Sequence, residues 1–206
     1  MRRSFPIFLL AALTVAALPA PAPAAEHDER LLLALAAYHE DPPAEALDFL
    51  GASREAALEA VARDESQMRL RRIRAISVLV REDGEAGRRL AAEVIGDARW
   101  SWRLRIAATR ALGNYQQHRE GTAALLRRAT FDADPGVRET AVRQLTLIDS
   151  PEARLALEEL RGRERHVAVR VALRDALLKA NPGATLPREG RQARELTPAT
   201  VKEVTP

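Results

Sequence analysis

The segment DPGVRETAVRQL, residues 134–145, indicates the architecture, because its central phrase occurs four times along the chain. The phrase starts at positions 71, 104, 137 and 169, and each copy has an arginine at its second residue and a leucine eight residues after its start. Successive starts are separated by 33, 33 and 32 residues. A fixed period of this length indicates a structural repeat in which each copy forms one supersecondary unit.

A second apolar segment precedes each copy, with its leucines and alanines at helical spacing. These segments are residues 56–63, 85–95, 122–130 and 152–160. We expect each unit to be a helix, a tight turn and a second helix. The expected helix ends lie at Gly84, Gly113, Gly136 and Ser150-Pro151. One such pair cannot bury its apolar stripe alone, whereas stacked pairs can, so the sequence predicts an all-α fold, a short α-solenoid.

This repeat resembles the HEAT repeat, in particular the short HEAT-like form that is also found in phycobilin lyases. The strongest copy is Asp134-Pro135-Gly136-Val137-Arg138 followed by Ala141 and Leu145, and the resemblance extends over residues 53–180. The first copy departs from the pattern, since Arg71 takes the place of the usual valine. We therefore expect about four helix pairs, preceded by a helical cap.

The first 25 residues have the order of a secretory signal peptide. Arg2 and Arg3 precede an uncharged run whose apolar part, residues 5–18, is shorter than the ~20 residues that a spanning helix needs. Ala22-Pro23-Ala24 then offers a small-residue cleavage site. We expect a mature protein without a transmembrane span, located in a periplasm or outside the cell. An uncleaved membrane anchor is the alternative.

Residues 26–52 and 181–206 flank the repeats and differ from them in composition. The first segment carries seven acidic side chains and one arginine. Its apolar pattern predicts a cap of two helices, residues 29–39 and 44–50, separated by a break at Pro42-Pro43. The repeats at 53–180 carry 25 basic and 19 acidic side chains. The tail contains four prolines and few apolar residues, so we expect it to be mostly disordered. The sequence leaves open whether the acidic cap docks on the basic array.

The arginine at the second position of each copy is interpreted as structural. These residues are Arg72, Arg105, Arg138 and Arg170. In HEAT-like proteins such an arginine commonly pairs with an aspartate of a neighbouring turn, and the bidentate fit of guanidinium to carboxylate suits this junction. The resemblance therefore implies an Asp/Arg ladder whose acids are Asp64, Asp97 and Asp134, with Asp132 as the alternative to Asp134. A basic row that binds a ligand is the other interpretation.

The second helices offer the candidate binding surface. At about 100° per residue, positions 0, 3, 4, 7 and 8 from each phrase start form the core side, and positions 2, 6 and 9 point away from it. If these helices line the concave side, as the resemblance implies, the outward positions form a groove. Tryptophan and arginine are enriched at binding hot spots. The predicted partner-binding residues are Ile73, Trp100, Trp102, Ile106, Arg110 and Arg143. In the alternative interpretation, flanking repeats cover the groove and the tryptophans fill the core.

Catalysis finds little support in the sequence. The chain has no cysteine, its four histidines lack metal-ligand spacing, and neither a phosphate-binding loop nor a nucleophile elbow is present. We therefore expect no catalytic, metal-binding or cofactor-binding residues. The leading hypothesis is an exported module that binds a protein or peptide partner in the cell envelope. The alternatives are a HEAT-like enzyme or chromophore lyase, and a weak polyanion-binding protein. Nucleic acid is not the expected partner, because six excess positive charges over 53–180 make a thin basic coat.

Overall fold

The structure, a computed structural model, describes residues 28–37 and 41–180, and every regular element in these ranges is helical. The elements are α1 (Glu29–Ala37), the 3-10 helix η1 (Ala44–Ser53), α2 (Arg54–Arg63), α3 (Arg69–Arg81), α4 (Glu85–Gly96), α5 (Trp102–Tyr115), α6 (Thr122–Ala129), α7 (Pro135–Leu145), α8 (Pro151–Arg163) and α9 (Val167–Ala180). The predicted signal peptide and tail lie outside the described residues. Among the helices that are described, none is long and apolar enough to cross a membrane.

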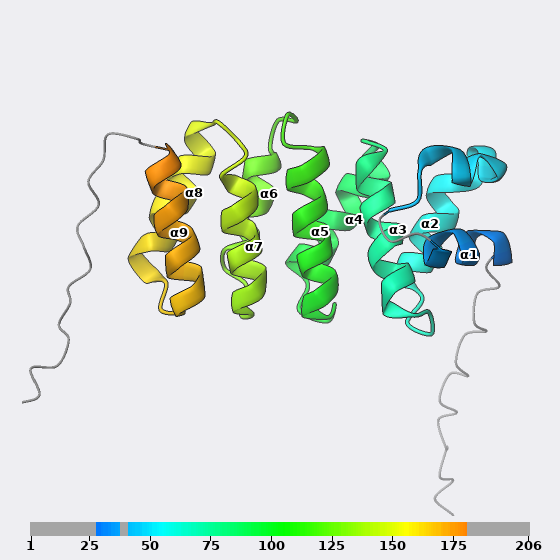
Figure 1. Ribbon diagram of the computed structural model, residues 1–206, viewed down its shortest axis with the longest axis horizontal. Coiled ribbons are helices and arrows are strands. Elements are labelled where there is room, and N and C mark those ends of the chain that lie inside the picture. The colour runs from blue at the N-terminus through cyan, green and yellow to red at the C-terminus, as the bar shows by residue number, and fades with distance from the viewer. Residues whose placement is uncertain (1–27, 38–40, 181–206) are drawn as a thin grey trace, which may run out of the picture.

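Eight of these helices form four successive pairs that stack in one row (Figure 1). The pairs are α2/α3, α4/α5, α6/α7 and α8/α9. The second helix of each pair lies beside the second helix of the next pair, and the first helices form a layer behind them. The second helices pack against one another more extensively than the first helices do. The predicted all-α solenoid of four helix pairs is therefore confirmed.

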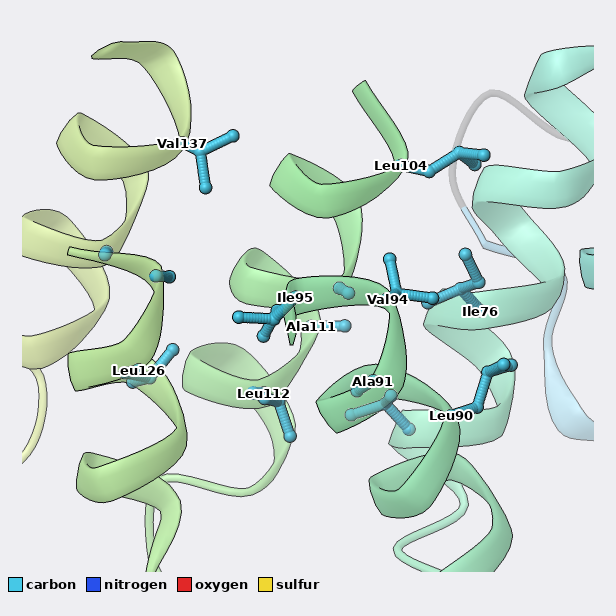
Figure 2. Packing of buried hydrophobic residues seen from close by; sticks show 14 of the residues in the cluster. Ile76, Leu90, Ala91, Val94, Ile95, Leu104, Ala111, Leu112, Leu126 and Val137 are labelled. Atoms are coloured by element: carbon cyan, nitrogen blue, oxygen red, sulfur yellow. The ribbon is translucent and has the colours of Figure 1, made fainter. Parts of the chain in front are cut away.

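A continuous apolar core runs between the two layers of helices. Leu104, Leu112 and Leu145, at the positions predicted to face it, expose at most 2% of their surface. Figure 2 shows how Val94 of α4 and Leu126 of α6 belong to the same cluster as the side chains of the second helices. Burying such a side chain stabilises the fold by about 1.5–3 kcal/mol relative to leaving it exposed. The core therefore joins each repeat to its neighbours as well as the two helices of one repeat to each other.

Side-chain caps begin two of the helices where the sequence indicates them. Asp134 accepts a 2.8 Å hydrogen bond from the backbone N–H of Gly136 and begins α7. Ser150 accepts one of 3.1 Å from the N–H of Ala153 and begins α8. In both helices proline is the first residue, where its missing N–H costs nothing. These caps fix the angle at which α7 and α8 leave the preceding turns.

Gly113 was expected at a helix end, but it lies inside α5. A Cβ atom at this position would sit 2.2 Å from Oε1 of Gln144 and 2.5 Å from its Cβ. The glycine is therefore needed for the close approach of α5 and α7. Gly136 has a similar role beside its place in the first turn of α7, because a Cβ there would lie 3.3 Å from Cδ1 of Ile106.

The acidic cap docks on the array through polar contacts with α2 and α3. Arg74 donates a 2.7 Å hydrogen bond to the carbonyl oxygen of Leu35 in α1. Arg54 pairs with Asp48 of η1, with 2.6 Å between the nitrogen and oxygen atoms. The predicted helix over 29–39 is described as far as Ala37. The predicted helix over 44–50 has 3-10 geometry, and the chain turns at Gly51, whose φ of 50° suits glycine.

Asp41 connects the cap to the second-helix layer. Its carboxylate accepts a hydrogen bond from the hydroxyl of Ser77 in α3 and another, of 3.2 Å, from the hydroxyl of Tyr115 in α5. Burial is the largest cause that raises the pKa of Tyr115, and the nearby Asp41 charge adds to it. An acidic residue of the cap thus lies against two helices of the array.

Candidate interaction surface

The outward side of α3, α5, α7 and α9 forms a surface that we term the second-helix face. Its residues follow the helical period at positions −2, 2 and 6 from each phrase start, which share one side of the helix. They are Arg69, Ile73, Ser77, Trp102, Ile106, Arg110, Pro135, Glu139, Arg143, Val167, Val171 and Asp175. All of these side chains are exposed or half-buried. Position 9 was predicted to belong to this face, but Val80 and Gly113 are buried and do not.

Three predicted binding residues form a stripe along α5. Trp102, Ile106 and Arg110 are four residues apart, so they lie one above the other on the same side of the helix. Trp102 exposes 40% of its surface, and the guanidinium of Arg103 lies 4.2 Å from the centre of its ring. Ile106 is half-buried because it packs over Gly136 at the start of α7.

Two further predicted residues lie on the helices that flank α5. Ile73 of α3 is half-buried and packs against the core, and Arg143 of α7 is exposed and pairs with Glu139 one turn earlier at 2.6 Å. The structure therefore brings together five of the six predicted residues on neighbouring helices of one layer.

Trp100, the sixth, does not lie on the second-helix face, although it borders a cleft beside Trp102. It precedes α5 in the turn, is half-buried and packs against the core cluster. The guanidinium of Arg72 lies 5.4 Å from the centre of its ring. This tryptophan is therefore a packing residue at the junction of the first two repeats, as the alternative interpretation had it.

The Asp/Arg ladder is present between the interior repeats. Arg105 donates two hydrogen bonds to Asp132 in the turn after α6, with nitrogen–oxygen distances of 2.6 and 2.9 Å. Arg138 donates two to Glu164 in the turn after α8, at 2.7 and 2.9 Å. Each arginine thus reaches the turn of the next repeat. The carboxylate of Asp132 raises the pKa of Arg105. The hydrogen bonds from Arg138 lower the pKa of Glu164 to about 2, although burial acts in the opposite direction.

The prediction that Asp134 is a ladder acid is wrong. Asp134 is the N-cap of α7 and binds backbone N–H groups there, whereas Asp132, the alternative, forms the rung. Glu164 is a ladder acid that the sequence analysis missed because it is a glutamate in a turn where aspartate was expected. The equivalent acids share one signature, since each accepts the backbone N–H of the residue two positions later. They are Asp64, Asp97, Asp132 and Glu164.

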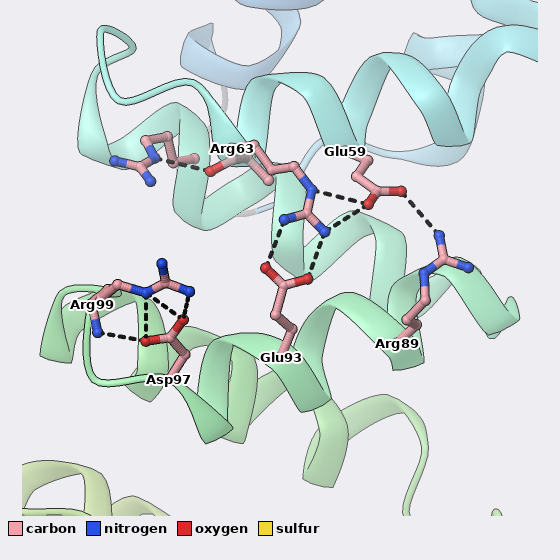
Figure 3. A network of polar contacts seen from close by, with 8 residues as sticks. Glu59, Arg63, Arg89, Glu93, Asp97 and Arg99 are labelled. Carbon is pink, nitrogen blue, oxygen red and sulfur yellow. Dashed lines mark hydrogen bonds and ion pairs between the residues drawn. The ribbon is translucent and has the colours of Figure 1, made fainter.

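The first rung of the ladder is replaced by a different contact. By analogy with the interior repeats Arg72 would reach Asp97, but Asp97 pairs with Arg99 in its own turn at 2.6 Å (Figure 3). Arg72 donates instead to the carbonyl oxygen of Ala62 at 2.9 Å and forms no ion pair within the described residues. Burial lowers the pKa of Arg72. Arg170 is exposed on α9, the last described helix, and Asp64 lies in the first turn.

Ion pairs between repeats also connect the first helices. Arg63 of α2 donates two hydrogen bonds of 2.7 Å to Glu93 of α4 and also contacts Glu59, which pairs with Arg89 (Figure 3). The hydrogen bonds from Arg63 lower the pKa of Glu93. Charged groups of the first helices therefore meet partners of the opposite sign across the junction between the first two repeats.

Two open clefts lie between the second and third repeats. One, of about 490 Å³, is lined by Trp100, Trp102 and Pro135, and the other, of about 410 Å³, by Gly96 and Phe131. Arg105 lines both clefts. Their open form suits contact with a polypeptide better than enclosure of a small molecule, whose sites bury most of the ligand. Within the described ranges, no group of three or more histidine and acidic side chains could hold a metal ion.

Comparison with known proteins identifies the repeat. Residues 92–178, from α4 to the last turns of α9, match the family model for HEAT repeats. Neither a curated protein nor a solved structure gives a significant match to the chain. The structure places α2 and α3 in the same stacked arrangement before the matched part. Residues 92–178 are therefore HEAT repeats, a module generally used for protein–protein interaction.

Proposed function

We propose that this protein is an exported HEAT-repeat scaffold that binds a protein or peptide partner in the cell envelope through its second-helix face. The observation that carries the proposal is the stripe of Trp102, Ile106 and Arg110 on α5, near the middle of the array. An exposed tryptophan and an arginine on one side of the same helix combine two of the residue types that are enriched at binding hot spots.

The packing behind this stripe supports a preorganised surface. Arg105 follows the N-terminal turn of the same helix, and its paired hydrogen bonds to Asp132 hold α5 against the next repeat. The core residue Leu112 anchors the C-terminal half of α5. A surface held on rigid elements loses little conformational entropy on binding, so more of the contact energy appears as affinity.

A scaffold is proposed rather than an enzyme because HEAT repeats are usually non-catalytic. The order of charge, apolar residues and small residues in the first 25 residues supports export. N-terminal sequencing of protein made in an exporting host tests this part, and a new N-terminus between Ala22 and Glu26 is expected. An intact Met1 in soluble cytosolic protein would contradict export.

The binding surface is tested by comparative affinity isolation from the cell envelope. The baits are the unmodified protein, Ile106→Asp on the second-helix face, and Leu155→Asp on α8, where the leucine exposes 66% of its surface. Both variants place a charge at an apolar side chain, but only Ile106 lies on the proposed surface. We expect the partner to be retained by the unmodified protein and by Leu155→Asp and lost from Ile106→Asp. Equal retention by all three baits would contradict the assignment.

A further inference from the structure

The positive charge of the array is segregated into one layer. The four second helices α3, α5, α7 and α9 carry 13 basic and two acidic side chains. The four first helices α2, α4, α6 and α8 carry nine basic and seven acidic side chains. The excess of positive charge therefore lies in the second-helix layer. Arg105 and Arg138 of this layer are neutralised by acids in the turns, and the second-helix face itself carries three arginines and two acidic side chains.

Many of the cations on this side lack a partner in the neighbouring repeat. Arg69, Arg103 and Arg110 are exposed, and none of the three forms an ion pair within the described residues. Among the residues that the structure describes, Arg143 pairs only with Glu139 of its own helix, and Arg174 only with the adjacent Asp175 at 3.2 Å. In the first-helix layer Arg63 and Arg127 reach acids of the next repeat at 2.7 Å, whereas Arg154 and Arg161 pair with acids close in sequence. Basic side chains outnumber acidic ones far more in the second helices than in the first helices. The second-helix layer is therefore the side of the molecule that would attract an anionic partner.

Apolar side chains lie between these cations. Trp102 and Ile106 precede Arg110 on α5, and Val171, which is 47% exposed, lies on the same face of α9. Leu70, 45% exposed, follows Arg69 on α3. A partner that covers this surface must therefore supply apolar groups as well as negative charge. A polypeptide segment can supply both, whereas a nucleic acid or a sulfated glycan offers mainly charge.

The chain itself shows that the layer accepts an acidic segment. Residues 26–52 carry seven acidic side chains, and Asp41 among them accepts hydrogen bonds from Ser77 on α3 and Tyr115 on α5. The buried Leu31 and Leu35 of α1 pack into the same core as the array. Asp41 and the packed helix α1 thus cover one end of the second-helix layer, and among the described residues the face on α5, α7 and α9 remains exposed or half-buried.

We propose that the second-helix face recognises an acidic polypeptide segment that also presents apolar side chains, with its carboxylates at Arg110 and Arg143 and its apolar groups against Trp102 and Ile106. This inference rests on the proposed function and specifies the chemistry of its partner. The pairs of guanidinium and carboxylate align the peptide along the face and raise its association rate, and the apolar contacts supply most of the affinity.

A displayed library of random 16-residue peptides, selected on protein purified from an exporting host, tests the proposal. We expect the enriched peptides to carry a net negative charge and at least two large apolar residues. Arg110→Glu combined with Arg143→Glu is expected to weaken their binding more than tenfold. The matched control is Arg154→Glu combined with Arg161→Glu on α8. These arginines are similarly exposed and, within the described part of the chain, pair only with acids close in sequence. The control should bind as the unmodified protein does, and circular dichroism should show equal helix content in all three proteins.

Four other outcomes would overturn the inference. Enriched peptides that are neutral or basic, but still lost in Ile106→Asp, would leave the proposed function standing with a different partner. Failure to enrich any peptide would contradict the proposed function as well. Heparin binding that is as tight as that of the peptides and unaffected by Trp102→Ala would assign the face to a polyanion. A dimer in sedimentation that is lost in Arg110→Glu would assign it to a second copy of this chain.

Discussion

Arg105 of α5 and Asp132 in the turn after α6 form paired hydrogen bonds of 2.6 and 2.9 Å that join the second repeat to the third. Less than a tenth of either side chain is exposed. Arg138 and Glu164 repeat the arrangement between the third and fourth repeats. These rungs are specific to the stacked state, because each unites residues that are about a repeat apart in sequence. They therefore contribute to the interfaces between repeats on which the stability of a solenoid depends.

Asp132→Ala and Asp97→Ala should differ strongly in stability, although the two aspartates occupy equivalent turns. Removing Asp132 leaves the buried Arg105 unpaired, which should cost about 3–5 kcal/mol. Asp97 pairs with Arg99, which is 91% exposed and remains hydrated when its partner is removed. The loss of folding stability in Asp97→Ala should therefore be much smaller than in Asp132→Ala. Urea unfolding followed by circular dichroism measures the free energy of unfolding of both variants. Similar midpoints for the two variants would show that the rung is not a stabilising contact.

The Arg138–Glu164 rung predicts how stability depends on pH. In the folded protein the pKa of Glu164 is lowered to about 2 from its ordinary 4.5. Its contribution is therefore fully present above about pH 5 and is lost as the pH falls towards 2, because the unfolded state then binds a proton that the folded state does not. Such a shift is worth roughly 3 kcal/mol. We expect Glu164→Gln to unfold at lower urea concentration at pH 7 and to lose less stability than the unmodified protein between pH 5 and pH 2.

The control for this measurement is Glu158→Gln, because Glu158 is 47% exposed and pairs with Arg161 on the surface of α8. Its pH profile should match that of the unmodified protein. If the stability of Glu164→Gln depends on pH as that of Glu158→Gln and of the unmodified protein does, the Glu164 carboxylate does not cause the loss of stability in acid.

Two glycines inside helices should respond to alanine with opposite signs. A Cβ at Gly87 of α4 would lie 2.1 Å from the carbonyl oxygen of Leu79, so α4 or α3 would have to move. Such overpacking costs about 1–3 kcal/mol. Gly162 of α8 has no atom within 4 Å of that position. There, Gly162→Ala should stabilise the protein by up to about 1 kcal/mol through helix propensity. Thermal melting of both variants checks the prediction, which fails if Gly87→Ala melts no lower than Gly162→Ala.

A substitution in the core should reduce protection from hydrogen exchange mainly in the repeats beside it. Leu112→Ala removes a fully buried side chain of α5 and should cost about 2–5 kcal/mol. Because each repeat contacts only its neighbours, amide protection should fall most in α4–α7 and least in α9. Uniform loss of protection along all helices would indicate a single cooperative unit in place of a nearest-neighbour array.

The helices could be predicted from the sequence because each of their determinants is local. The apolar period places Leu104, Leu112 and Leu145 in the core, and Ser150-Pro151 and Asp134-Pro135 begin their helices as capping chemistry requires. Even the irregular first copy, with Arg71 at the usual valine position, forms α3 in register with the others.

The contacts between repeats could be predicted only in part, because they depend on the stacking offset of two helix pairs. The repeated arginines indicate a ladder, but only the structure shows that Asp132, and not Asp134, pairs with Arg105. It also shows that Asp97 pairs with Arg99, so that Arg72 binds a backbone carbonyl oxygen in place of this aspartate. Gly113 gives no sign in the sequence that Gln144 of the next repeat lies against it. The segregation of charge into one layer likewise appears only once the helices are assigned to layers.

Site-specific photo-crosslinking in the cell envelope shows whether the second-helix face is the binding surface. A photoreactive amino acid replaces Val171 on the second-helix face in one strain and Leu155 on α8 in another, because both side chains are exposed and neither is assigned a contact with the partner. We predict a discrete crosslinked species from position 171, removed by Ile106→Asp in the same chain, and none from position 155. Crosslinking from position 155 with none from position 171 would contradict this assignment.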